Sequence, residues 1–446
     1  MDRGEKRLSI STKMFVVAAS FALPIAVLVY FVVANINETI DFARWELMGN
    51  AYQRPLESLM QGLLKVDVAT HRCAAGASDC DASVKAASAQ VNRAFDALEG
   101  VDREVGTDLQ FTEEGLGKRD RSHLRVANVR AEWQRVAASI AGGSSPAVDE
   151  QMDHLVADVR GMITHAGDTS NLILDPDLDS YYLMDVTLLA LPQTQDRIAK
   201  TTILGGDLLR SGITPEDRTK LAVQAALLKE SDLDRIVASS QTSLNEDANF
   251  YGTSATLRSE LKPALARYQA AATRFIDMTA ALAAPGAASV DSAAYTAAGV
   301  EALDASFQMW NVAVQELDRL LEARIATRVQ ARTRALTLAA IALVIASFLA
   351  YVTARSISRP LDALVQTLGP GATLLGQCVA SIAEASQRES TTPEEAAIIC
   401  EELNAHCEDM RRAAAELTAQ VKGGRVGVSS ESGLGTPPLE PQLGTA

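Results

Sequence analysis

The sequence predicts an all-α fold from its composition and its periodicity. Apolar residues make up 48% of the 446 residues but aromatic residues only 5%, a composition that suits helices rich in Ala and Leu better than sheets. Gly (27) and Pro (14), which interrupt helices, are few for this length. Between residues 35 and 334 the apolar positions recur at helical spacing, with almost no strand-like alternation.

The first expected element is a membrane span at residues 14–34 (MFVVAASFALPIAVLVYFVVA), which carries no charge. At about 1.5 Å per residue, such a helix covers the roughly 30 Å of hydrocarbon in a bilayer. A cleaved signal peptide is the alternative. Its apolar core is usually only about 7–15 residues long and ends at an A-x-A site. This stretch is longer and no clear site follows it, so we expect an anchor.

A second uncharged stretch covers residues 335–354 (ALTLAAIALVIASFLAYVTA). A buried core helix is the alternative, but such a helix normally has a polar face. This stretch offers only Thr, Ser and Tyr as polar residues. We therefore expect a second membrane span, and with it the lipid bilayer as a partner.

The charges around the first span predict its orientation. Four basic residues lie within 1–13, whereas residues 38–46 are mostly acidic, so the amino terminus should stay in the cytoplasm. The charges around the second span decide little. Two passes then place residues 35–334 outside the cytoplasm and residues 355–446 inside, with both termini cytoplasmic.

Residues 35–334 should form about eight helices, because Gly, Pro and Asp signals for loops recur along them. One up-down bundle needs four helices, so we expect two bundles, in tandem or stacked end to end. Thr214-Pro215-Glu216-Asp217 predicts a helix start with Thr as the cap. A seam with steps of four and three predicts the core face of the last helix. Its members are Leu303, Phe307, Trp310, Val314, Leu317 and Leu321.

The overall charge excludes one class of partner. Asp and Glu number 56 against 41 Lys and Arg, a formal net charge of -15. Such a chain repels a phosphate backbone, so we expect no nucleic-acid partner. Five His and five Cys are scattered, too few for a zinc cluster or a dense disulfide scaffold. We expect neither a metal nor a cofactor.

The most unusual string is SNLILDPDLDSYYLMD at residues 170–185. Together with His71-Arg72, Trp133 and LDRLLEARI at 317–325, it resembles the sensory region of bacterial methyl-accepting chemotaxis receptors and related membrane-bound signalling proteins. The resemblance covers about the first four fifths of the chain, up to residue 360. It implies a periplasmic helical sensory module in the bacterial inner membrane, a homodimer or a heterodimer with related receptors, and signalling by small helix displacements.

The carboxylates of this string suggest a site for a cation or an amine, with the two tyrosines as a wall. A calcium site is a poor fit, because an EF-hand loop needs Gly at its sixth position and Glu at its twelfth. This string has Ser180 and Val186 there. The residues that we expect to bind a small periplasmic ligand are Asn171, Asp175, Asp177, Asp179, Tyr181 and Tyr182.

A helix cap is the alternative for the same string. Asp175 would be the N-cap and Pro176 the first helical residue. Asp177 and Asp179 would then be favoured by the helix dipole.

Cys73 and Cys80 flank AAGASD between two helical stretches. In an oxidising periplasm this spacing suits a disulfide that closes a hairpin. A redox or metal role together with His71 is the alternative.

The segment after the second span, residues 355–422, resembles a HAMP relay at its start, RSISRPL. Gly369-Pro370-Gly371 departs from that pattern. Farther on, residues 394–421 resemble either the end of a receptor signalling hairpin or a second HAMP helix. Both interpretations predict a dimeric coiled coil whose seam includes Cys400 and Cys407. Residues 423–446 are rich in Gly, Ser and Pro and should be disordered.

The resemblance would call for a long signalling hairpin with a kinase-binding tip, and no such tip, kinase motif or GGDEF string follows the second span. We therefore expect a transmembrane sensor with an incomplete output domain. A regulatory or structural subunit that heterodimerises with full-length receptors is the alternative. No nucleophile–base pair or metal-ligand spacing indicates an enzyme.

Overall fold

The computed structural model describes residues 10–140, 145–285 and 290–387, with a few positions between 398 and 413. Every regular element among these residues is a helix and none is a strand, so the all-α prediction is confirmed. The predicted coiled-coil seam with Cys400 and Cys407, and the tail at 423–446, lie outside the described residues.

The chain divides into two units. One unit, Phe31–Ala335, contains the helical core. The other combines Met1–Tyr30 with Leu336–Ala446. Helices α1 (Ile10–Ala74) and α11 (Ser292–Gln387) contribute residues to both units.

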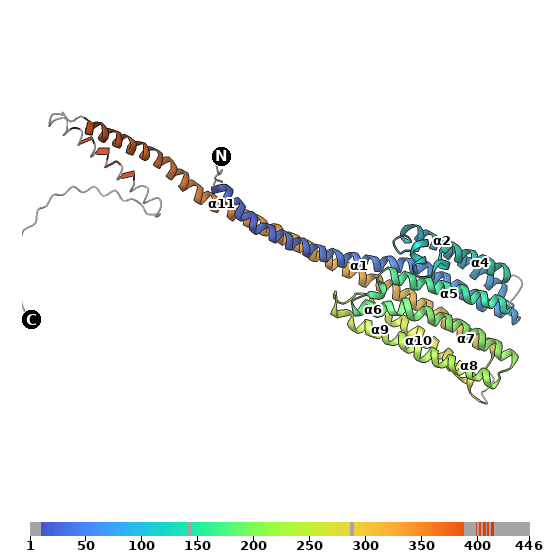
Figure 1. The fold of residues 1–446 in the computed structure, drawn as a ribbon. Coiled ribbons are helices and arrows are strands. Elements are labelled where there is room, and N and C mark those ends of the chain that lie inside the picture. The colour runs from blue at the N-terminus through green and yellow to red at the C-terminus, as the bar shows by residue number, and fades with distance from the viewer. Residues whose placement is uncertain are drawn as a thin grey trace, which may run out of the picture. The chain divides into compact units, whose positions relative to one another are not determined.

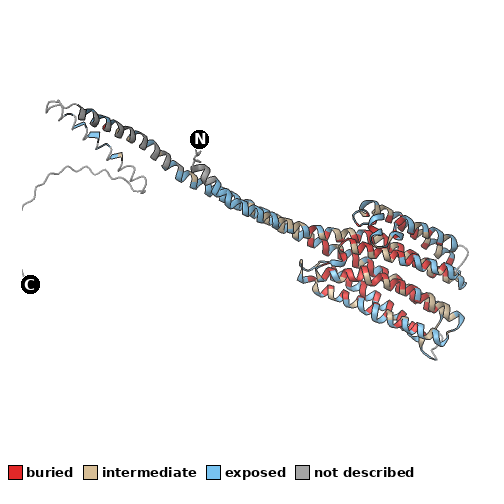
Figure 2. Cartoon of the chain, viewed as in Figure 1, coloured by how far each residue is buried: buried red, intermediate tan, exposed pale blue. Residues whose placement is uncertain are grey.

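Both long helices carry a segment that is apolar enough and long enough to cross a membrane. Their most apolar windows have mean hydropathies of 2.6 and 2.4, and 0% of either window is buried. Large apolar side chains such as Phe21 and Phe348 are exposed there, and both helices are pale blue along these stretches in Figure 2.

The core unit contains a first set of helices that packs on α1. Helix α2 (Cys80–Val105) follows the hairpin after α1, and α4 (Val126–Ile140) and α5 (Pro146–Thr169) complete the set. The indole of Trp133 on α4 donates to Asn92 on α2 at 2.9 Å. Between α2 and α4 lie α3 (Glu113–Gly117) and the 3-10 turn η1 (Ser122–Leu124).

A second set packs on α11. Its elements are the 3-10 turn η2 (Leu172–Leu174), α6 (Leu178–Met184), the π-helical η3 (Asp185–Ala190), α7 (Leu191–Ser211), α8 (Pro215–Ala226), the π-helical η4 (Leu227–Leu233), α9 (Asp234–Glu246), the 3-10 turn η5 (Asp247–Asn249) and α10 (Leu257–Ala283). The predicted start of α8 is confirmed, because the Thr214 side chain accepts the amide of Asp217 within a capping box.

The two sets lie side by side with their helices nearly parallel (Figure 1). One continuous hydrophobic core runs through both. The facing helices are joined by polar contacts as well, since Gln195 of α7 donates to Glu57 of α1 at 2.5 Å and Arg160 of α5 to Asp196 of α7 at 2.9 Å. This arrangement differs from the tandem or end-to-end bundles expected from the number of helices.

The predicted seam of α11 is confirmed, because all six residues from Leu303 to Leu321 are at most 2% exposed. The Trp310 indole also donates to the carbonyl of Thr187 at 2.9 Å. Close approach of α7 to α11 depends on a glycine, since a Cβ at Gly299 would lie 2.0 Å from the Thr202 hydroxyl oxygen. The buried seam and this close approach therefore hold α11 against η3 and α7.

Candidate functional site

The segment after α5 reverses direction at Asn171, which adopts a left-handed conformation (φ 66). Asn tolerates this region better than most residues because its short amide can bond locally. The chain then passes through η2 and runs extended through Asp175 and Asp177 before α6 begins at Leu178. This path carries the first two carboxylates of the string into the core.

These carboxylates meet a buried arginine of α11. The Arg324 side chain is only 2% exposed. Its Nη2 donates to Asp175 Oδ1 and to Ser180 Oγ, both at 2.6 Å, and its Nη1 donates to Glu46 Oε2 of α1 at 2.7 Å. Its Nε forms an ion pair with Asp177 Oδ2 at 2.6 Å. One guanidinium thus joins α11, α1 and the 175–180 segment.

Proton binding decides how much charge this cluster carries. Burial, followed by the nearby Asp175 carboxylate, raises the pKa of Glu46 to about 9, although Arg324 opposes the shift. Burial also raises the pKa of Asp175 against the effect of Arg324. At neutral pH Glu46 is therefore protonated, and its proton removes the repulsion between two buried carboxylates. The charge that remains on Asp175 is paired with Arg324, as it must be, because an uncompensated buried charge is costly.

The structure brings only part of the predicted site together. Asp175 and Asp177 form ion pairs with Arg324, so the cation that they bind is supplied by the chain itself. Asp179 is buried and accepts the amide of Ser180, and burial raises its pKa to about 6. Tyr181 and Tyr182 contact each other edge to face, with centroids 5.4 Å apart.

The aromatic ring beside the arginine comes from elsewhere. Tyr251 lies with its ring centroid 6.0 Å from the Arg324 guanidinium carbon and 5.8 Å from that of Arg328. Tyr251 and Glu46 were missed by the sequence reasoning, and no local signal marks either residue. Arg324 could have been found, because it continues the 4–3 seam three residues after Leu321.

The expected helix cap lies two residues later than predicted. Asp177 is the residue before α6, and its side chain makes no capping hydrogen bond. The Asp175 side chain instead accepts the amide of Asp177 at 3.0 Å while it pairs with Arg324. The buried guanidinium holds this carboxylate in the core, and the helix therefore starts beyond it.

A polar seam on α1 continues from the arginine cluster. Glu46, Asn50, Gln53 and Glu57 are all at most 3% exposed and follow steps of four, three and four. Asn50 donates to Asp318 of α11 at 2.8 Å. This face of α1 is thus polar over three turns: Glu46 and Asn50 bond to α11, and Glu57 accepts from Gln195 of α7.

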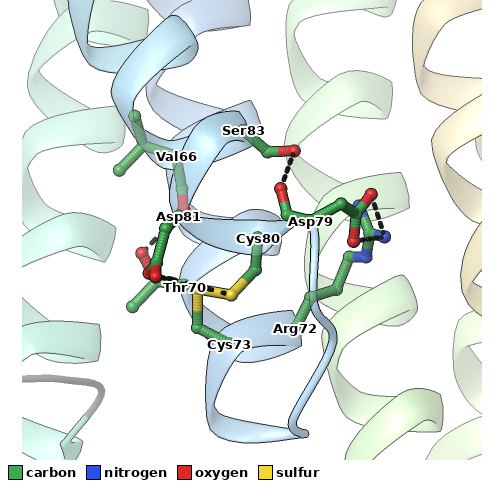
Figure 3. The surroundings of a disulfide bond; sticks show 8 residues. All are labelled: Val66, Thr70, Arg72, Cys73, Asp79, Cys80, Asp81 and Ser83. Atoms are coloured by element: carbon green, nitrogen blue, oxygen red, sulfur yellow. Dashed lines mark hydrogen bonds and ion pairs between the residues drawn. A yellow bond between two sulfur atoms is a disulfide. The ribbon is translucent and has the colours of Figure 1, made fainter.

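Cys73 and Cys80 form a disulfide between the end of α1 and the start of α2, with their Cα atoms 5.1 Å apart (Figure 3). Arg72 beside it pairs with Asp79 at 2.8 Å. The hairpin is therefore fixed by a covalent bond and an ion pair. Cys378 is a free, buried cysteine of the described part of α11.

A groove of about 1220 Å³ lies between α10 and α11 near the same hairpin. Its walls are formed by alanines of both helices, and four arginines line it: Arg72, Arg210, Arg267 and Arg274. Glu301 and Asp304 supply acidic groups on the α11 side, paired with Arg274 and Lys65. The groove is large enough for a small organic molecule.

Comparisons of the chain with protein-family models, with curated proteins and with solved structures find no match.

Proposed function

We propose that the protein is a non-catalytic transmembrane signal transducer whose region between the two apolar segments senses a periplasmic stimulus. The observation that carries this proposal is the Arg324 cluster. It joins the 175–180 segment to α1 and α11, and these are the two helices that continue into the apolar segments.

The physical basis is the cost of separating buried charges. A movement of the 175–180 segment would pull Asp175 from the guanidinium, and a buried charge left without its partner costs several kcal/mol. The segment and α11 should therefore move together. Because Glu46 holds α1 on the same guanidinium, a small displacement would change the relative position of both helices.

The membrane placement rests on the exposure of the apolar segments. Contiguous apolar surface of this length is unusual on a soluble protein, and residues 14–34 and 335–354 each match the thickness of a bilayer. A two-pass protein with both termini in the cytoplasm follows from the basic residues within 1–13. The inner-membrane location and the dimeric state follow from the resemblance to chemotaxis receptors.

For the stimulus we propose a small organic acid bound in the groove between α10 and α11. Arginines bind carboxylates by paired N–H donors, and the alanine walls suit a short apolar body. Arg267 is exposed and lines the groove. In this proposal Asp175 and Asp177 transmit the signal and do not contact the ligand.

The test uses the full chain in lipid nanodiscs. A thermal-shift panel of organic acids, amino acids and amines identifies a binder, and Arg267→Ala should weaken an acid that binds in the groove. Spin labels at the exposed positions Glu38 of α1 and Gln330 of α11 then report the distance between the two helices, with Cys378, Cys400 and Cys407 replaced by Ser.

A saturating binder should change the distance between the labels. In Arg324→Met the binder should still bind, but the distance should no longer respond. Unchanged distances in the wild-type background at saturation would contradict signal transduction. An amine as the sole class of binder would contradict the choice of ligand but not the relay.

A further inference from the structure

His71, in the last turn of α1, has carboxylates against both of its ring nitrogens. Its Nε2 lies 3.3 Å from Asp149 Oδ1 of α5 and 3.9 Å from Asp67 Oδ1, one turn earlier on α1. Its Nδ1 lies 3.3 Å from Asp207 Oδ2 of α7. Three helices therefore supply polar groups to one imidazole.

The spacing on the Nε2 side suits a metal ion. The ligand atoms of Asp67, His71 and Asp149 all lie within 4.8 Å of one another. Around an ion with bonds of about 2.0–2.2 Å, neighbouring ligand atoms are roughly 3.0–3.6 Å apart. The separation of His71 Nε2 from Asp149 Oδ1, 3.3 Å, falls in this range, and Asp67 Oδ1, at 3.9 Å from Nε2, would have to move closer.

The Nδ1 side has the arrangement that orients a metal-bound histidine. Asp207 Oδ2 lies 3.3 Å from Nδ1, where it can accept a hydrogen bond from a neutral imidazole that binds an ion through Nε2, on the side of Asp67 and Asp149. Such outer carboxylates fix the tautomer and the ring orientation at metal sites. Arg210 also pairs with Asp207, on the far side of this carboxylate from the proposed ion, and Lys200 pairs with Asp153 and Asp196.

Burial and access also fit. The side chains of His71 and Asp67 are 14% and 13% exposed, whereas Asp149 is 41% exposed. An ion could enter from the Asp149 side and bind to groups that packing already holds in place. Water molecules would complete its coordination from that open side.

Two other groups of similar residues in the described part of the chain fit less well. Cys73 and Cys80, beside Asp81, are joined in a disulfide and cannot serve as thiolate ligands. The His154 side chain is 61% exposed, and the carboxylates of Glu132 and Asp158 both approach its Nδ1, at 2.7 Å and 3.9 Å, so neither carboxylate is left to orient the ring from the other nitrogen. The His154 group therefore serves as a matched control of the same chemical composition.

We propose that His71 Nε2, Asp67 and Asp149 bind a divalent transition-metal ion such as Zn²⁺, with Asp207 as a positioning residue. One imidazole with carboxylates favours such an ion over Mg²⁺, which prefers oxygen ligands alone. The bound ion would join α1 to α5 beside the disulfide hairpin. This proposal does not rest on the signalling function.

The test begins with the full, disulfide-bonded chain in nanodiscs, freed of metal by a chelator. Equilibrium dialysis against Zn²⁺ should give one ion per chain, and Zn²⁺ should raise the melting temperature while Mg²⁺ should not. Co²⁺ should give an absorption spectrum typical of nitrogen and oxygen ligands. The absence of saturable Zn²⁺ binding would overturn the proposal.

Variants assign the ligands. Asp149→Asn, at a half-exposed position that should not affect folding, should weaken Zn²⁺ binding by ~10-fold or more. Asp207→Asn should weaken it by about 10–100-fold while the stoichiometry stays the same. His154→Gln should bind Zn²⁺ like the wild type. Wild-type affinity in both His71→Gln and Asp149→Asn, or loss of binding in His154→Gln, would show that the ion lies elsewhere.

Discussion

At the scale of single residues, the arginine at position 324 shows what a sequence pattern can and cannot reveal. The 4–3 seam of the last helix predicts that position 324 faces the core, and the structure places it there at 2% exposure. Its partners could not be predicted. Glu46 and Asp175 lie 278 and 149 residues away along the chain, and only tertiary packing brings them together.

The cluster predicts unequal effects of removing its members. Arg324→Ala should lower the free energy of unfolding by about 3–5 kcal/mol, because Asp175 would remain buried without a cation. Glu46→Gln should cost less than about 1 kcal/mol, since Glu46 is protonated at neutral pH and Gln preserves a neutral acceptor. Denaturant unfolding of both variants in the same micelles measures the difference. Equal losses would contradict a neutral Glu46.

Buried glutamic acids of α1 also predict how stability depends on pH. Burial raises the pKa of Glu46 to about 9. Burial also raises the pKa of Glu57 to about 8, because its effect outweighs that of the Gln195 hydrogen bond, which lowers this pKa. Above the unfolded-state pKa the unfolded chain releases these protons while the folded chain keeps them. The free energy of unfolding should therefore fall as pH rises from about 5 to about 9.

The double variant Glu46→Gln/Glu57→Gln tests this pH dependence. The pair should flatten the fall in the denaturation midpoint between about pH 5.5 and 8.5, because neither position can then release a proton on unfolding. Glu104→Gln, at an exposed position of α2, is the control and should keep the wild-type slope. A slope that is unchanged in the double variant would assign the dependence to other groups.

At the scale of helices, local signals were reliable where local physics determines the structure. Thr214 begins α8 as its capping pattern predicts. The start of α6 was displaced from the predicted cap, because Asp175 pairs with Arg324. No capping or turn motif in the sequence marks the π-helical turns η3 and η4, and η3 ends directly before the first turn of α7, which contains Pro192.

The hairpin between α1 and α2 gives a prediction at this scale. Reduction of the Cys73–Cys80 bond, or Cys73→Ser with Cys80→Ser, should lower the free energy of unfolding by about 2–3 kcal/mol for so short a loop. Mass spectrometry without reduction should show this pair oxidised in protein isolated from membranes. Free thiols at both positions in freshly isolated protein would contradict an oxidising compartment for residues 35–334.

At the scale of the whole molecule, helix number alone could not decide how the helices pack. Eight helices are compatible with stacked bundles and with bundles placed side by side. Which of the two arrangements forms depends on which helices have two faces that can each pack against a neighbouring helix. Helix α1 bonds to α7 and α11, and α7 bonds to α1 and α5, and one hydrophobic core extends through both sets.

Topology provides the last prediction, because every proposal about a periplasmic stimulus depends on the side on which residues 35–334 lie. Alkaline phosphatase folds into an active enzyme only outside the cytoplasm, where its disulfides form. A fusion after Gly252, in an exposed loop between α9 and α10, should be active in a bacterial host. A fusion after Ala446 should be inactive, and green fluorescent protein at the same two positions should give the reverse pattern. The four basic residues within 1–13 produce this orientation, so replacing all four with Gln should make it mixed. An inactive phosphatase after Gly252 together with an active one after Ala446 would invert the topology and place the groove between α10 and α11 in the cytoplasm.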